Sequence, residues 1–454
     1  MAEKVARSLS LFGAVATIVG LVVGASIFIL IPGLAGMCGP SLWLAYLLSS
    51  IPAIFAVLYL IQLGAALPVT GANYIAVTRW LSPMAGFSGS MVTLVAIVST
   101  NCIVAWGFAQ YLTDMFPLIP PLLIAIGIIL LFGLINWMGV KAFEFVQIIM
   151  FLAFIVAMVM FGVGGTIHAD PALIRPLFPN GVRSFFFAVA IANFSWGGLI
   201  VIAEVAGEIK NPRRNIPLAL IISLLLILVL YVLQTFALTA TMSWKEAGNI
   251  GATAVIDAAH RFLPSWAVGY LWISALLAMA TSVNAIMMLA AREALVLSRD
   301  KILPHFLSRI NPRFKTPEGA LLFITVLSLA GVLVSADLER YALIVVLALM
   351  VLQMLGASAV FRMPRVAADI YEKAEIRFNR FWQAFTWVGC MVLFGGIFVF
   401  SFQEDPKTGL IFIGIYALGF VYWQVRKAHL KKRNIDIEKE LKKISEVTLL
   451  EMES

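Results

Sequence analysis

The feature that most constrains this chain is a succession of apolar runs that extends along nearly all of its 454 residues. Each run holds about 20 residues or more, the length at which an α-helix crosses a hydrocarbon core about 30 Å thick. Of all residues, 62% are hydrophobic and 12% are charged, which is too apolar for a water-soluble domain of this size. Backbone polar groups in lipid must be satisfied internally, and helices achieve this. The sequence therefore predicts an all-α membrane protein.

We predict twelve transmembrane helices. They cover residues 11–36, 41–67, 85–113, 119–139, 143–165, 184–206, 216–241, 266–298, 318–335, 341–362, 382–402 and 409–426. The first run is longer than the apolar region of a signal peptide and lacks a small-residue cleavage site, so we expect it to remain in the membrane. The loops are too short for a soluble domain. Residues 243–264 and 429–454 carry helical patterns of their own.

Basic side chains are distributed unevenly between the two sides of these helices. Cytoplasmic loops of membrane proteins carry an excess of Lys and Arg. When the loops are assigned alternately to two sides, all but six of the 32 Lys and Arg residues fall on the side that holds both termini. The six exceptions are Arg175, Arg183, Lys245, Arg261, Arg340 and Lys407. We therefore predict a plasma-membrane protein whose N-terminus, residues 1–10, and tail, residues 427–454, are cytoplasmic. The same asymmetry explains the net charge of +8 without a nucleic-acid partner.

Two of the predicted helices contain glycine-rich interruptions. The first helix reads Gly24-Ala25-Ser26 within a run of Val and Ile, and the sixth reads Asn193-Phe194-Ser195-Trp196-Gly197-Gly198. An unwound turn exposes N–H and carbonyl groups that are costly in lipid unless they line a cavity or meet a ligand. The N–H groups of residues 25–27 suit a carboxylate, and the carbonyls of the sixth helix suit an ammonium group. Together the interruptions predict a zwitterion site, and the alternative is that these small residues serve close helix packing.

These interruptions stand at the start of two groups of five helices. Helices 1–5 occupy residues 11–165 and helices 6–10 occupy residues 184–362, and helices 11 and 12 follow in residues 382–426. Because five is odd, a repeat of the first group would have the opposite orientation in the membrane. Two broken helices meet near the midplane in such an arrangement. We therefore expect a five-plus-five inverted repeat with broken helices 1 and 6.

Five motifs occur in order along the chain. They are Gly20…Gly24-Ala25-Ser26-Ile27-Phe28…Pro32-Gly33; Leu67-Pro68…Gly71…Tyr74 with Pro83…Gly86-Phe87; Asn136…Gly139-Val140-Lys141…Gln147; Ala206-Gly207-Glu208-Ile209-Lys210-Asn211-Pro212…Pro217; and Ser298-Arg299-Asp300-Lys301…Pro304 with Thr316-Pro317. On these residues the chain resembles the amino acid–polyamine–organocation transporter family over nearly its whole length, with Ser26 where many members have glycine. The resemblance implies the inverted-repeat fold of the bacterial leucine transporter.

The resemblance also implies a substrate site between the two interruptions. The binding residues that it implies are Val23, Gly24, Ala25, Ser26, Ile27, Asn101, Phe194, Ser195, Trp196 and Gly197. Phe194 or Trp196 would be an aromatic gate, and the alternative is that these rings only fill the core. Trp106, Ser282 and Asn284 join Asn101 as candidates for side-chain selectivity.

The position just after the interruption in helix 6 bears on the charge of the substrate. Relatives that carry cationic substrates can place an acid there, where this chain has Ile200. A cationic side chain buried without a counter-charge is expensive. We therefore expect a neutral L-amino acid.

The energy source follows from an absent motif and from the resemblance. The sequence has no GxxxxGK[ST] phosphate loop, so we expect secondary active transport rather than direct use of ATP. Some proton-coupled relatives place a lysine of helix 5 where sodium sits in others, and this chain has Phe154 there. The resemblance implies a sodium site, with Na+ as coupling ion and no other cofactor. Its residues are Gly20, Val23, Ala278, Thr281 and Ser282. The alternative is that the two hydroxyl groups only bond within their own helix.

Glu204 is an acid inside a predicted span, and intramembrane acids are functional candidates by default. We regard it as a proton-relay candidate. The alternative is a structural role, in which Glu204 pairs with Arg292 or with a backbone donor near the cytoplasmic mouth.

Other classes of protein fit the sequence less well. Cys38, Cys102 and Cys390 are dispersed in apolar segments, the four histidines fall in loops or in the tail, and no HExxH pattern occurs, so we expect neither an enzyme nor a structural metal site. A channel would need a filter sequence or charged rings that we do not find. A proton-coupled or exchange transporter of amines or cationic amino acids stays open, as does a nutrient sensor built like a transporter. The substrate and membrane lipid are the only partners that we expect.

Overall fold

The computed structural model describes residues 9–69, 71–138, 140–204, 206–314, 316–334 and 337–442, apart from the side chains of residues 24, 25, 114, 140–147, 208 and 442. Its long helices are α1 (Leu11–Cys38), α2 (Leu42–Ala66), α4 (Pro83–Met115), α5 (Pro121–Trp137), α6 (Val140–Ile167), α7 (Gly181–Ala192), α9 (Pro212–Thr241), α12 (Ser265–Arg299), α13 (Glu318–Val334), α14 (Leu338–Val366), α16 (Arg380–Glu404) and α17 (Pro406–Lys431). Each predicted span coincides with one of these helices, and the sixth continues beyond α7. The prediction of an all-α membrane protein is confirmed for the residues that the structure describes.

Short helices connect or extend the long ones. They are η1 (Gly39–Ser41), α3 (Ala72–Ala76), η2 (Val77–Leu81), η3 (Asn193–Ile200), α8 (Val201–Glu204), η4 (Ala206–Glu208), α10 (Trp244–Ile250), α11 (Ala254–Ala259), η5 (His305–Ser308), α15 (Ala368–Lys373) and α18 (Ile437–Lys442). The helices predicted in residues 243–264 are therefore present as α10 and α11.

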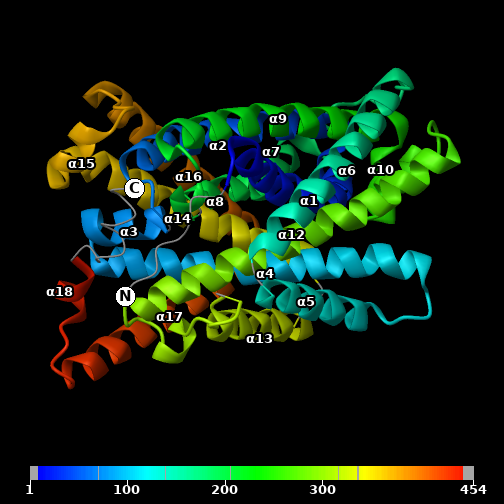
Figure 1. The fold of residues 1–454 in the computed structure, drawn as a ribbon. Coiled ribbons are helices and arrows are strands. Elements are labelled where there is room, and N and C mark those ends of the chain that lie inside the picture. Colours follow the sequence, from blue (N-terminus) through cyan, green and yellow to red (C-terminus); the bar gives the residue numbers. More distant parts are fainter. Residues whose placement is uncertain are drawn as a thin grey trace.

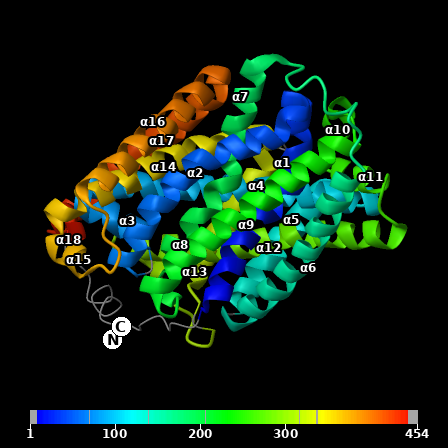
Figure 2. The ribbon, with the colours of Figure 1, turned by 90° about the horizontal axis from the view of Figure 1, so that it is seen from above.

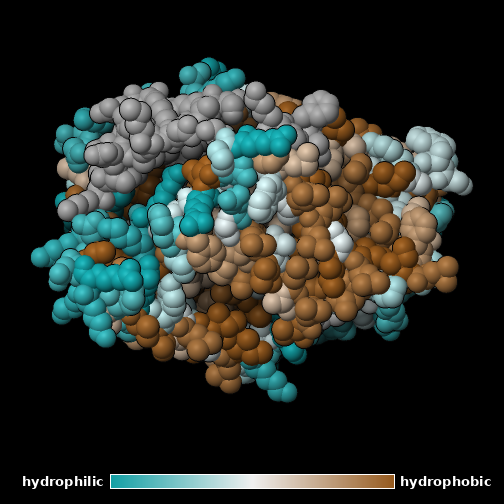
Figure 3. Space-filling view, turned by 60° about the horizontal axis from the view of Figure 1, so that its bottom comes forward, coloured by the Kyte–Doolittle hydropathy of each residue, from teal (hydrophilic) through white to brown (hydrophobic). Residues whose placement is uncertain are grey.

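The described helices include nine segments that are long and apolar enough to cross a membrane. One of them, Leu11–Ala66, contains both α1 and α2, and the apolar helices α5 and α13 are shorter, with 17 residues each. Figure 3 shows a broad hydrophobic region across the middle of one face, while hydrophilic residues gather at its left end. Exposed apolar side chains such as Leu418 and Val392 belong to such a surface. The chain is thus a multi-pass membrane protein, and the count of twelve crossings stays a prediction.

The helices pack in a pattern that repeats between the two predicted halves. α2 lies along α9, α4 along α12, and α5 along α13, so each helix contacts the one five spans later (Figures 1 and 2). Other contacts occur in matching pairs: α4 packs on α14 as α12 packs on α6, and α1 packs on α9 as α7 packs on α2. This pattern supports two halves of related structure. The inversion of the second half stays a prediction.

At the end of the bundle that holds α3 and α15, loops far apart in sequence are joined. Leu9 forms an isolated parallel bridge with Ile209, and the N–H of Lys210 donates to the Leu9 carbonyl at 2.9 Å. The Tyr74 hydroxyl donates to Asp300 Oδ2 at 2.6 Å. Burial raises the pKa of the Asp300 carboxyl, and the hydrogen bond from Tyr74 opposes that rise. These contacts connect the residues before α1, the exit of the sixth predicted span and the loop after α12.

The described part of the tail lies at this same end (Figures 1 and 2). α18 contacts η2 and α4, and Lys427 Nζ of α17 lies 2.6 Å from Glu438 Oε1. Leu9 and α18 therefore share one end of the bundle, as the prediction for the termini requires. Residues 1–8 and 443–454 of the predicted cytoplasmic segments lie outside the described residues, and the cytoplasmic assignment of this end stays a prediction.

At the opposite end, α10 packs on α1 through a pair of glycines. A Cβ atom added to Gly36 would lie 2.9 Å from Gly248 Cα, and one added to Gly248 would lie 2.7 Å from Gly36 Cα. Asn180 Nδ2 donates to the carbonyls of Gly36 and Met37, each at 3.0 Å. The contact between these two helices therefore depends on the absence of side chains at both glycines.

We predict that Gly248→Ala lowers the free energy of unfolding by about 1–3 kcal/mol, because the added methyl group must push α10 away from α1. Thermal denaturation of the purified protein in detergent measures this change. Gly269→Ala is the matched control, since a Cβ at Gly269 meets no heavy atom within 4 Å; that variant should be as stable as the parent or slightly more so. Equal melting temperatures for both variants would contradict the packing described for Gly248.

Candidate functional site

The sixth predicted span changes its helix type where the sequence predicts an interruption. The α-helical part, α7, ends at Ala192, and the next eight residues form the 3₁₀ helix η3 before α8 begins at Val201. Runs of 3₁₀ helix longer than three or four residues are uncommon and often mark hinges. Asn, Ser and two glycines are poor α-helix formers, which weakens the α-helix at this point. The interruption is thus present, as a change of helical geometry rather than as an unwound turn.

The two glycines of η3 also permit close packing. A Cβ added to Gly197 would lie 2.3 Å from Leu349 Cδ1 of α14, and one added to Gly198 would lie 2.5 Å from Val22 Cγ2 of α1. The packing role that the sequence left open is therefore real and accompanies the interruption. It holds η3 directly against α1.

The first predicted helix is continuous, so the predicted unwound break at Gly24-Ala25-Ser26 is wrong for this structure. α1 runs as one α-helix from Leu11 to Cys38. Val23 and Ile27 are fully buried, and the Ser26 hydroxyl donates to the Val22 carbonyl one turn earlier at 2.8 Å. Packing against α9, α12 and η3 overrides the low helix propensity of glycine. The side chains of residues 24 and 25, both predicted to bind substrate, lie outside the described residues.

Tyr231 of α9 joins α1 to η3. Its hydroxyl lies 2.8 Å from the Val22 carbonyl, 3.1 Å from the Ser195 carbonyl and 2.6 Å from Ser26 Oγ. Tyr231 is fully buried, and Ser26 and Ser195 are each 1% exposed. We call these four oxygen atoms, Val22 O, Ser26 Oγ, Ser195 O and Tyr231 Oη, the oxygen cluster. It stands where the sequence predicts the two halves of the site to meet.

Our sequence reasoning missed Tyr231. A signal existed, because the predicted span 216–241 is aliphatic from Leu224 to Leu230 and then carries Tyr231, Gln234 and Thr235. A hydroxyl in the middle of a lipid-embedded helix needs a partner, and such residues mark polar sites.

Two aromatic rings enclose the oxygen cluster. The Tyr46 ring lies 4.9 Å from the Tyr231 ring and the Trp196 ring 5.5 Å from it, measured between centroids. Tyr46 Oη lies 3.4 Å from Ser195 Oγ, and Trp196 Nε1 donates to Ser49 Oγ of α2 at 2.8 Å. The structure therefore turns Trp196 toward α2. Phe194 is buried with 8% of its surface exposed, and the gating role of both rings stays a prediction.

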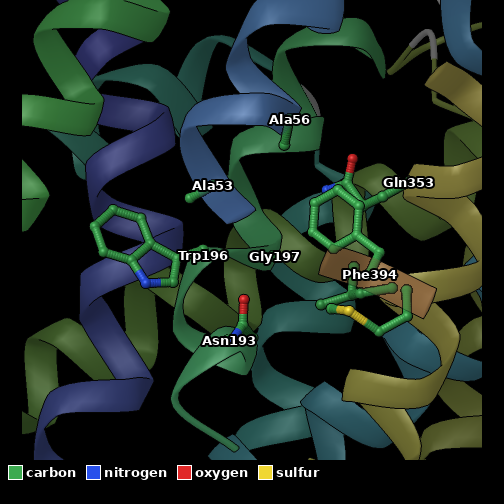
Figure 4. Close-up of a pocket in the computed structure, with 9 residues that line it drawn as sticks. Ala53, Ala56, Asn193, Trp196, Gly197, Gln353 and Phe394 are labelled. Atoms are coloured by element: carbon green, nitrogen blue, oxygen red, sulfur yellow. The ribbon is translucent and has the colours of Figure 1, made fainter. Parts of the chain in front are cut away.

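A small cavity lies on the other side of η3 (Figure 4). It is lined by Ala53, Ala56, Asn193, Trp196, Gly197, Leu349, Met350, Gln353 and Phe394. The cavity has room for about one water molecule. The Tyr59 hydroxyl donates to Gln353 Oε1 at 2.5 Å beside it. In Figure 4 the Trp196 ring extends away from Gln353 and Phe394. The lining residues come from α2, η3, α14 and α16, and none comes from α1 or α9. Trp196 is the residue that the cavity shares with the surroundings of the oxygen cluster.

Asn101 does not reach the oxygen cluster. Its Nδ2 donates to Ser328 Oγ of α13 at 3.1 Å. The side of α4 that faces α1 carries Gly107, where an added Cβ would lie 2.2 Å from Ile29 Cδ1, and Tyr111, whose hydroxyl lies 3.4 Å from the Phe28 carbonyl. Asn101 therefore points to the side of α4 away from α1. The sequence predicts where this helix begins and ends but not its rotation about its axis, so it does not show which side of the helix faces α1.

The structure brings four of the five predicted sodium ligands together between α1 and α12. The Thr281 hydroxyl lies 3.4 Å from the Gly20 carbonyl and donates to the Ala278 carbonyl at 2.7 Å, and the Ser282 hydroxyl donates to Ala278 O at 3.3 Å. Val23 is buried in the adjoining turn of α1. Both hydroxyl groups therefore bond within their own helix, and Thr281 also reaches the Gly20 carbonyl of α1. The same oxygens form a set that suits a hard cation.

Glu204 lies at the last turn of α8, next to α3. The N–H of Gly71 donates to its carbonyl at 3.4 Å, and a Cβ on Gly71 would lie 3.8 Å from Glu204 Oε2. A backbone donor near the mouth, one of the two structural alternatives, is therefore present, although it uses the main chain and not the carboxylate. Glu293 of α12, which is 4% exposed, interacts electrostatically with Glu204. We did not name Glu293 from the sequence. Glu293 is an acid inside the predicted span 266–298, and acids inside membrane spans are functional candidates.

Comparisons with known proteins agree with this architecture. Residues 9–423 match the profile of the amino acid permease family. The branched-chain amino acid permease BcaP of Bacillus subtilis is 26% identical over 358 residues, 74% of this chain and 76% of that protein. The vacuolar cationic amino acid transporter 8 of Arabidopsis thaliana is 26% identical over 329 residues, 68% of this chain and 55% of that protein. The aspartate-proton symporter of Bacillus subtilis is 26% identical over 336 residues, 69% of this chain and 65% of that protein. This chain belongs to the amino acid permease family and is a membrane transporter of amino acids, not an enzyme.

Proposed function

We propose that this protein is a secondary active transporter of neutral L-amino acids that works by alternating access. The observation that carries the proposal is the oxygen cluster between α1, η3 and Tyr231, which is buried and consists of two backbone carbonyls and two hydroxyl groups. An ammonium group carries several N–H donors and a charge, so it binds such oxygens strongly. Every α-amino acid has this group, whatever its side chain.

The uncharged surroundings of the cluster favour a neutral side chain. Neither α1 nor η3 contains a charged residue. Ile200 ends η3 and is 8% exposed. A cationic or anionic side chain bound there would lose hydration without gaining a partner. The related proteins are named for branched-chain amino acids, cationic amino acids and aspartate, so membership of the family does not identify the substrate. In this proposal the neutral side chain is inferred from the uncharged residues around the oxygen cluster.

Alternating access requires that the site close at both ends and that a helix change shape. Contacts at the α3 end join Leu9 to Ile209 and Tyr74 to Asp300, and the Gly36–Gly248 contact joins α1 to α10 at the other end. A 3₁₀ helix rises about 2.0 Å per residue and an α-helix 1.5 Å, so converting the eight residues of η3 would shorten the span by about 4 Å. We propose that η3 is the hinge. Unwinding of α1 beside residue 24 in the substrate-bound state would then supply N–H groups to the carboxylate.

For the driving ion we propose sodium, bound by the oxygens of Gly20, Val23, Ala278, Thr281 and Ser282. The convergence of Thr281 with the Gly20 carbonyl supports it. Proton coupling is the second candidate, because Glu204 of α8 and Glu293 of α12 are two acids that interact electrostatically. Acids inside membrane spans commonly serve in proton relays.

We predict that neutral L-amino acids stabilise the purified protein against heat and are taken up by proteoliposomes, whereas L-arginine, L-aspartate and polyamines have at most weak effects. Ligands that bind the native state raise its apparent melting temperature. Thermal shift across a set of amino acids and amines, followed by uptake and counterflow of the radiolabelled hits, measures this. Strong uptake of L-arginine would contradict the neutral assignment. Binding without counterflow would indicate a sensor.

Removing either aromatic ring beside the interruption should change transport kinetics. We predict that Phe194→Ala and Trp196→Ala each raise KM several-fold, because the rings exclude water from the bound substrate. Phe381→Ala on α16 is the matched control, since that ring is 69% exposed on the outer surface. If both site variants show the kinetics of the parent, neither ring is a gate.

The coupling ion can be read from uptake at fixed pH in sodium chloride and in choline chloride. We predict faster uptake in sodium, loss of this stimulation in Thr281→Val, and its retention in Thr281→Ser, which keeps the hydroxyl oxygen. Equal uptake in the two salts would exclude sodium coupling. In that event, an altered pH dependence in Glu204→Gln would support the acid pair as the proton site.

A further inference from the structure

The oxygen cluster has fewer hydrogen atoms than its contacts require. Four pairs of oxygens approach closely: Tyr231 Oη with Val22 O, Ser195 O and Ser26 Oγ, at 2.8, 3.1 and 2.6 Å, and Ser26 Oγ with Val22 O at 2.8 Å. The two carbonyls are acceptors only, and each hydroxyl supplies one hydrogen. Two hydrogens cannot bridge all four contacts with good geometry. The cluster is short of donors.

Burial makes this shortage costly. Tyr231 is fully buried and Ser26 is 1% exposed, so water from the bulk does not supply the missing hydrogens. Val22 and Ser195 lie inside helices, where their carbonyls also accept backbone N–H groups. The cost therefore comes from the close oxygen pairs that have no hydrogen between them. A ligand with several N–H donors would relieve the shortage, and an ammonium group has three such donors.

We propose that the Tyr231 hydroxyl is a stand-in for the ammonium group of the substrate. In this structure its single hydrogen is shared between the carbonyls of Val22 and Ser195. An amino acid binds by taking over these carbonyls and displacing the hydroxyl. Tyr231 thus sets the affinity, because each binding event must first break the bonds that the tyrosine makes. This inference rests on the proposed function and names a residue of α9 as its affinity determinant.

Displacement of the Tyr231 hydroxyl requires a substrate with several hydrogen-bond donors. A compound must offer more N–H donors than the single O–H that it displaces, so primary amines should bind best. A 2-hydroxy acid offers one donor, which only replaces the one lost. A carboxylic acid without the amine offers none.

The test compares Tyr231→Phe with the parent in binding of L-leucine and of 4-methylpentanoate, the same molecule without its amine. We expect the Kd for L-leucine to fall about tenfold in Tyr231→Phe, the factor that corresponds to about one net hydrogen bond. The Kd for 4-methylpentanoate should not change. L-alanine and propanoate form a second pair of probes. Isothermal titration of the detergent-solubilised protein measures all four.

Tyr59→Phe is the matched control. Tyr59 is a buried tyrosine of α2, 1% exposed, whose hydroxyl donates to Gln353 Oε1 at 2.5 Å on the far side of η3. This variant loses one buried hydrogen bond, as Tyr231→Phe does, but should leave the Kd for L-leucine within twofold of the parent. A general effect of destabilisation would move both variants alike.

Several results would overturn the proposal. An unchanged or raised Kd for L-leucine in Tyr231→Phe would show that the hydroxyl is not displaced, and an equal gain for 4-methylpentanoate would show that the amine is not what replaces it. If Tyr231→Phe does not fold, 3-fluorotyrosine at position 231 keeps the hydroxyl, and its fluorine resonance must shift with L-leucine and not with 4-methylpentanoate. Failure of the parent to bind any amino acid would instead reject the proposed function.

Discussion

A backbone carbonyl inside a membrane has to find its donors within the protein, because lipid offers none. This constraint organises the centre of the molecule. η3 departs from α-helical geometry over eight residues, and the Ser195 carbonyl within it lies 3.1 Å from the hydroxyl of Tyr231. The same hydroxyl reaches Val22 of α1. One tyrosine on α9 therefore links the two helices that the sequence marks as unusual.

Close backbone approach is the second condition of this architecture. Gly198 lets η3 lie directly against Val22, and Gly36 and Gly248 let α10 close onto α1. At the opposite end Leu9 pairs with Ile209. α1 is thus held against its neighbours at the centre and near both of its ends. A change in the length of η3 would have to be accommodated by contacts of this kind.

The sequence predicts the helices well because the apolar runs have the length that lipid imposes, and residues 193–198 identify the interruption in the sixth span. It does not predict the state of α1, because Gly24 has the same propensity whether or not α9, α12 and η3 pack around it. Asn101 contacts Ser328 of α13 and not the oxygen cluster, which the sequence could not indicate because composition gives a span but not its rotation. Tyr231 could have been found because it follows the aliphatic run Leu224–Leu230 in the middle of a membrane span, whereas its contacts with Val22 and Ser195 depend on a tertiary arrangement that no local pattern contains.

In the proposed function, the oxygen cluster receives the amino group of an amino acid. The most direct measurement is an experimental structure of the transporter with bound L-leucine at a resolution that places the ligand nitrogen. We expect that nitrogen within hydrogen-bond distance of the carbonyls of Val22 and Ser195, with the Tyr231 hydroxyl moved away from both. A ligand nitrogen bound elsewhere, with Tyr231 still on these two carbonyls, would contradict the account.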